Sequence, residues 1–90
     1  MTRTELAAAG DLLAAAAEDA DSADVRETLS GLAEQLDRLA DADRGPDHGR
    51  LARIESKLDD VRRGESDDVA TVIDEALDEI HAYRETLQGV

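Results

Sequence analysis

Hydrophobic residues recur at helical spacing in four blocks of the chain, and short polar segments separate the blocks. The clearest block has spacings of 4-3-4-3, the pattern of helices that pack side by side, and consists of Val25, Leu29, Leu32, Leu36 and Leu39. Residues 51–61 follow a 3-4-3 pattern, and an apolar stripe continues through residues 69–87. No segment alternates β-branched and polar residues as a strand would. The pattern therefore predicts an all-α protein.

The first block runs from Leu6 to about Ala20 and is rich in alanine. Thr2-Arg3-Thr4-Glu5 matches a capping box, in which Thr2 would accept at the N-cap and Glu5 would reach back. Gly10 costs about 1 kcal/mol relative to alanine inside a helix. We therefore expect Gly10 to mark a close contact with another helix.

The boundary between the first two blocks is predicted to be a break near residues 19–23. From Ala20 to Val25 the apolar face turns by about 140°, at about 100° per residue. Asp21 or Ser22 would then cap the second helix. One continuous helix over both blocks is the alternative, and it would need a second chain to cover its two stripes.

Glycine, proline and serine mark the remaining boundaries. Gly45-Pro46 forms the clearest loop, with Gly45 suited to the C′ position of the preceding helix. Gly64 is expected to end the third helix, and Ser66 to cap the fourth after a short connection that makes the two antiparallel. We predict one domain over residues 1–90, an antiparallel bundle of four helices, or three if the first two are continuous.

The apolar content is too small for a large core. Sixteen of the hydrophobic residues are alanine, and the chain has neither Phe nor Trp. Because oligomerisation often compensates for a thin core, we expect a homodimer or a complex with another helical protein. The predicted interaction face comprises Val25, Leu29, Leu32, Leu36, Leu39, Val69, Ile73, Ile80, Tyr83 and Leu87.

The charge balance is strongly acidic, with 23 acidic and 10 basic residues and a net charge of −13. Lys57 is the single lysine. This composition favours work in concentrated salt, where the Debye length falls to about 3 Å at 1 M. We expect K⁺ and Na⁺ to associate with the acidic surface without specific sites.

Several classes of function are disfavoured by what the sequence lacks. Without cysteine there is no disulfide, thiolate metal site or thiol nucleophile. No apolar run approaches the length of a membrane span, and no signal peptide precedes the first block. We expect a cytoplasmic protein with no membrane association and no cofactor.

Carboxylates spaced three residues apart offer one enzymatic alternative. Glu34 with Asp37, and Glu75 with Asp78, resemble the paired acids with which all-α nucleotide pyrophosphohydrolases hold Mg²⁺. Such pairs occur by chance in so acidic a chain, and six are present. We therefore interpret these carboxylate pairs as part of a solvated acidic surface and not as a metal site.

Residues 44–63 form the only basic stretch, and Arg50, Arg53 and Lys57 share one helical face. A DNA-associated regulator is a second alternative on this ground. Nucleic acid is nevertheless an unfavoured partner, because phosphate binding weakens steeply with salt and no aromatic residues accompany the arginines. Salt bridges within the bundle or across a dimer explain the stretch better.

Two side chains near the end of the chain have simpler expected roles. His81 is predicted to pair with Glu85, four residues later. The Tyr83 ring is expected to pack at the edge of the bundle with its hydroxyl in water.

The C-terminal half, roughly residues 50–87, resembles small acidic helical proteins of haloarchaea. The likeness lies in Arg53-Ile54-Glu55, Gly64-Glu65-Ser66 and Asp78-Glu79-Ile80-His81-Ala82-Tyr83-Arg84. The resemblance implies a helical fold and a salt-loaded cytoplasm, and it carries no functional residue. Together these features predict a non-enzymatic helical interaction module adapted to high salt.

Overall fold

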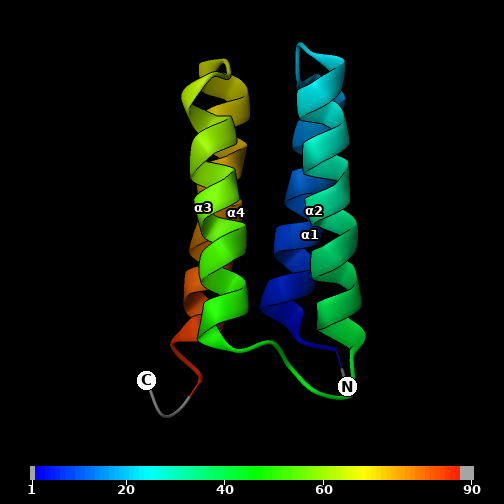
Figure 1. Ribbon diagram of the computed structural model, residues 1–90, viewed down its shortest axis with the longest axis vertical. Helices are drawn as coiled ribbons and strands as arrows, with labels where there is room; N and C mark the ends of the chain where they lie inside the picture. The colour runs from blue at the N-terminus through cyan, green and yellow to red at the C-terminus, as the bar shows by residue number, and fades with distance from the viewer. Residues whose placement is uncertain (1, 88–90) are drawn as a thin grey trace.

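The protein is a bundle of four antiparallel helices. The computed structural model describes residues 2–87, which form α1 (Thr4–Asp19), α2 (Ala23–Asp41), α3 (His48–Arg63) and α4 (Asp67–Arg84). Figure 1 shows two upright hairpins, α1 with α2 and α3 with α4, joined by one crossing segment. The predicted all-α bundle of four helices is confirmed.

The first two helices are separate, as the break near residues 19–23 predicted. Ala20 leaves α1 in an extended conformation, and its side chain is 5% exposed. Ser22 caps α2, because its hydroxyl accepts from the Val25 amide at 3.1 Å. The alternative of one continuous helix is therefore wrong.

The N-terminal segment departs from the predicted capping box. Arg3, not Thr2, is the N-cap residue of α1, and it provides no side-chain cap. The Arg3 amide donates to the Ala40 carbonyl at 2.9 Å, while the Thr2 hydroxyl donates to Asp41 at 3.1 Å. The capping box fails because the helix begins one residue later than expected, with Arg3 at the N-cap, and the Thr2 hydroxyl binds Asp41 at the end of α2.

Arg3 also places a cation at the C-terminal end of α2. Its Nη1 donates to the carbonyl oxygens of Leu39 at 3.1 Å and Ala42 at 2.7 Å. The last carbonyls of a helix lack intrahelical donors, and positive charge there opposes the helix dipole favourably. Arg3 thus joins the start of α1 to the end of α2.

Replacing this guanidinium should weaken the α1–α2 hairpin. We expect Arg3→Gln to lower the free energy of unfolding by about 1–3 kcal/mol, the range for lost charged hydrogen bonds. Urea titration at molar KCl measures the change. Arg26→Gln, an exposed arginine on the same helix pair, is the matched control and should change stability by less than about 0.5 kcal/mol. Equal effects of the two variants would contradict the assigned role.

Helix α1 occupies the centre of the packing, against both α2 and α4. Small side chains allow this close approach, and Gly10 is the tightest point. A β-carbon there would lie 3.2 Å from the Ala33 carbonyl oxygen and 2.5 Å from an Asp37 carboxylate oxygen. The expectation that Gly10 marks a close helix contact is confirmed.

Helices α3 and α4 are joined by ion pairs as well as by apolar packing. Arg62 binds Asp74 through two hydrogen bonds of 2.5 and 2.9 Å. This contact holds the pKa of the Asp74 carboxyl below its ordinary value, mainly through the hydrogen bond from Arg62. The pair is exposed, so its main effect is to fix the register of the two helices.

A second polar cluster joins the other end of the α3–α4 hairpin. Arg84 donates to Glu55 at 2.6 Å and to Nδ1 of His48 at 3.1 Å. His81 Nε2 lies 3.3 Å from the second Glu55 carboxylate oxygen. The predicted His81–Glu85 pair is wrong, because α3 brings Glu55 to the side of α4 where His81 lies.

The segment from Ala42 to Asp47 connects the hairpins. Asp47 caps α3 by accepting from the Arg50 amide at 2.8 Å. Gly45 is not the C′ residue of α2, which already ends at Asp41. A β-carbon at Gly45 would lie 2.7 Å from Arg3 Nε and 2.7 Å from the Tyr83 hydroxyl. Close approach of two side chains, not helix termination, requires glycine here.

The final boundaries agree with the sequence in part. Gly64 is the C-cap of α3, and Ser66 caps α4 by accepting from the Val69 amide at 3.4 Å. Helix α4 ends at Arg84, so Leu87 lies beyond the helix, although it still packs against the core. Tyr83 is 8% exposed and belongs to the core itself.

Candidate docking groove

Not every pair of neighbouring helices in the bundle is in close contact. Helix α1 packs closely against α2 and α4, and α3 packs against α4, whereas α2 and α3 are not a closely packed pair. Figure 1 shows α2 and α3 standing side by side at the front of the bundle with space between their backbones. We call the surface between them the α2–α3 groove.

Three adjoining hollows run along the α2–α3 groove. The largest, about 540 Å³, lies toward Asp24 and Glu27, and the smallest, about 260 Å³, lies in the middle over Leu32 and Ile54. The third, about 290 Å³, reaches Gly45 and Pro46 at the other end. Neighbouring hollows share lining residues, so the groove is continuous.

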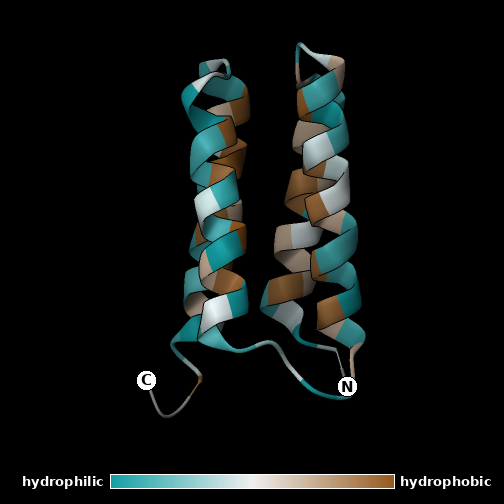
Figure 2. Cartoon of the chain, viewed as in Figure 1, coloured by the Kyte–Doolittle hydropathy of each residue, from teal (hydrophilic) through white to brown (hydrophobic). Residues whose placement is uncertain are grey.

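The floor of the α2–α3 groove is apolar. Leu32 and Ile54 are 9% and 3% exposed and belong to the core, and Leu39 is half-buried at the lower end. Figure 2 shows hydrophobic positions on the sides of α2 and α3 that face each other. An open groove with an apolar floor is the kind of surface in which an amphipathic helix packs.

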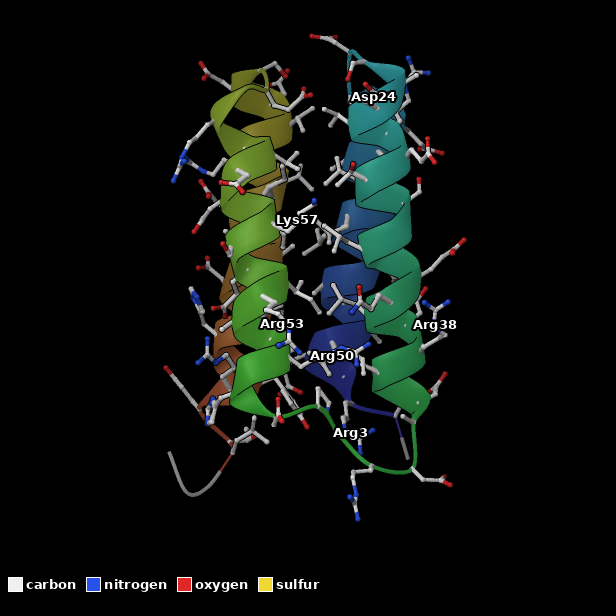
Figure 3. The ribbon with its side chains drawn as sticks, in the orientation of Figure 1. Arg3, Asp24, Arg38, Arg50, Arg53 and Lys57 are labelled. Carbon is white, nitrogen blue, oxygen red and sulfur yellow. The ribbon has the colours of Figure 1, made fainter. Side chains whose placement is uncertain are left out.

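One wall of the groove is basic. Arg50, Arg53 and Lys57 are all exposed, and all three line it. Figure 3 shows them along the side of α3 that faces α2, whereas Arg38 projects from the outer side of α2. The structure thus brings the predicted basic face to the edge of the groove. These residues form the only predicted set that converges on a concave surface.

A single side-chain bridge crosses the groove among the described residues. The Gln35 amide, oriented with its oxygen toward α3 as its neighbours require, accepts from Arg50 Nε and Nη2 at 3.2 and 3.1 Å. Arg50 is therefore partly satisfied within the chain. Arg53 and Lys57 are the cations left for an external partner along this wall.

The opposite wall contains an unexplained glycine. Gly31 lies in the middle of α2, lines the largest hollow and is exposed. A β-carbon there would meet nothing within 4 Å, so no contact inside the chain requires glycine. Glycine costs about 1 kcal/mol against alanine in a helix, and no close contact within the described chain offsets that cost.

Most of the predicted interaction face lies inside the core. Seven of the ten residues are buried within the single chain, and these are Leu29, Leu32, Leu36, Val69, Ile73, Ile80 and Tyr83. Val25, Leu39 and Leu87 are half-buried. Leu32 and Leu39 also line the α2–α3 groove. The heptad stripes thus form mainly the core of the single chain, and Leu39 is the half-buried member that also lines the groove.

The carboxylates of the enzymatic alternative stay apart. Glu34 and Asp37 lie on α2, Glu75 and Asp78 on α4, and all four side chains are exposed. These helices are not a closely packed pair, since α1 separates them. Within residues 2–87 no group of three or more acidic or histidine side chains is placed to hold a metal ion.

Sequence reasoning found the basic wall but missed Gln35 and Gly31. The role of Gln35 was missed because this residue lies beside an apolar stripe. For Gly31 a signal was present, because a glycine in the middle of an otherwise regular heptad block costs helix stability.

In the described part of the chain, no helix is both long and apolar enough to cross a membrane.

Comparison with known proteins gives one match. The sequence model of a family of unknown function (DUF7553) matches residues 1–86, nearly the whole chain. No curated protein and no solved structure matches significantly.

Proposed function

Since the chain belongs to the DUF7553 family, whose function is unknown, we propose from its geometry that it is a non-enzymatic helical interaction module. The α2–α3 groove is its docking surface. The observation that carries the proposal is the open side of the bundle, where α2 and α3 are not closely packed and the hollows between them reach the core residues Leu32 and Ile54.

The shape and chemistry of the groove support a helical partner. Its length follows two helices, its floor contains Leu32 and Ile54, and its rim is charged on both sides. Buried apolar contact contributes affinity, while charged rims set orientation and specificity. A nucleic-acid partner is disfavoured, because Asp24 and Glu27 line the same groove and would repel phosphate.

Blocking the groove should abolish binding without unfolding the chain. We expect immobilised wild-type protein to capture a helical partner, its own chain included, from an extract of its source cells at molar KCl. Gly31→Trp fills the largest hollow and should reduce capture by about tenfold or more, equivalent to about 1.4 kcal/mol. The readout is mass spectrometry of the captured proteins, with circular dichroism to verify folding.

Ala82→Trp is the matched control, since Ala82 is exposed on α4 and lies outside the groove. It should capture as much as the wild type. Equal capture by all three proteins, or no specific capture by the wild type, would refute docking through the groove.

A further inference from the structure

The occupant of the α2–α3 groove, we infer, is a second copy of this chain, related by a two-fold axis parallel to the helices. The inference rests on the proposed function and identifies its partner. In this arrangement the front face formed by α2 and α3 packs against the same face of the second copy, so that α2 of each copy meets α3 of the other.

The charges of the two helices favour this axis. The α3 side of the face presents Arg53 and Lys57, and the α2 side presents Asp24 and Glu27. A two-fold axis parallel to the helices places the acidic helix on the basic one twice. An axis across the helices would place α2 on α2 and α3 on α3, which opposes like charges.

The positions along the helices also match. Lys57 lines the same hollow as Asp24, Glu27 and Gly31. A two-fold axis parallel to the helices preserves these positions between copies. Lys57 therefore meets Asp24 and Glu27 of the second copy.

The available area is adequate for a stable dimer. The bundle measures 37 × 22 × 16 Å, and α2 and α3 form one of its two broad faces (Figure 1). The rectangle that encloses this face measures 37 × 22 Å, and a standard interface buries about 800 Å² on each partner, so the dimer covers nearly the whole face.

The dimer explains why residue 31 is a glycine. It lies on the exposed side of α2 beside the hollow, with open space above it. A glycine at that position lets the backbone of a facing helix approach closely, as small residues do at other helix contacts. The helix propensity lost within one chain is then offset by contact between two chains.

Charge reversal in two separate chains tests the arrangement. We expect sedimentation equilibrium at molar KCl to give twice 9.7 kDa for the wild type. Arg53→Glu/Lys57→Glu should be monomeric at concentrations where the wild type is dimeric, and so should Asp24→Lys/Glu27→Lys. An equimolar mixture of the two variants should dimerise again, because each α2 then meets an α3 of opposite charge.

Cysteine pairing reports the axis, and the chain has no cysteine of its own. Mixed Glu27→Cys and Lys57→Cys chains should form the mixed disulfide in large excess over either symmetric one. Glu75→Lys/Asp78→Lys, a charge reversal on the exposed side of α4, is the matched control and should remain dimeric.

A wild type that is monomeric up to near-millimolar concentration would overturn the inference, and so would a dimer that neither reversal weakens. Predominance of symmetric disulfides would overturn the parallel axis. If the wild type is monomeric while capture still depends on Gly31, the partner is a different protein and the docking function stands. If both self-association and capture fail, the proposed function fails with the inference.

Discussion

Lowering KCl from about 1 M to about 0.1 M is expected to unfold much of the protein. The net charge is −13, and the Cα radius of gyration is 12.4 Å. At 0.1 M the Debye length is about 10 Å, close to the size of the bundle, whereas at 1 M it is about 3 Å. In dilute salt each carboxylate therefore repels the others within about 10 Å, and the thin core has little reserve against that repulsion.

Circular dichroism measures this loss as reduced helical signal and a lower melting temperature at 0.1 M. NaCl at matched ionic strength is the control, because screening alone predicts the same recovery with either cation. Full helicity and an unchanged melting temperature in dilute buffer would refute the predicted dependence on salt. Recovery with only one of the two cations would indicate a specific ion site instead.

Leu36→Ala is expected to lower the free energy of unfolding by about 3 kcal/mol, within the range of 2–5 kcal/mol for buried leucines. Leu36 is fully buried in α2 among the core residues. The core consists largely of alanine and nine large, fully enclosed side chains, so few neighbours can move to fill the space. Because small domains are stable by about 5–15 kcal/mol, one such change removes a large share.

Urea unfolding at molar KCl measures the loss. Leu39→Ala is the matched control, since Leu39 is half-buried on the same helix and lines the groove. We expect it to cost about 1 kcal/mol, because less apolar surface leaves the core. Equal losses for the two variants would show that the core is less tightly packed around Leu36 than its burial indicates.

Local signals in the sequence predicted the helices well. The break before Ser22, the caps at Ser22 and Ser66, and the end of α3 at Gly64 depend on residues within a few positions of one another. The contact at Gly10 was predicted for a similar reason, since a glycine in a helix costs stability that close packing can offset.

Features that join distant segments escaped prediction. Arg3 binds the end of α2 across more than thirty residues, and Glu55 lies beside His81 across two helices. Nothing within one helix indicates either partner. The open side of the bundle escaped for a related reason. All four helices carry apolar stripes. The way α1 packs between α2 and α4 decides which pair of helices stays apart.

The contacts at the two ends of the bundle also differ. Near the crossing segment, Arg3 binds the end of α2 while Gly45 lies against both Arg3 and Tyr83. At the opposite end, the turns at residues 20–22 and 64–66 each belong to one hairpin. The two hairpins are nevertheless held together at this end too, because α1 packs on α4 and Ala17, Ala20 and Val69 are buried there. The hollow near the crossing segment is about 290 Å³, and the one nearer the opposite end is about 540 Å³. The groove therefore has its larger hollow at the end away from the crossing segment, beside Gly31.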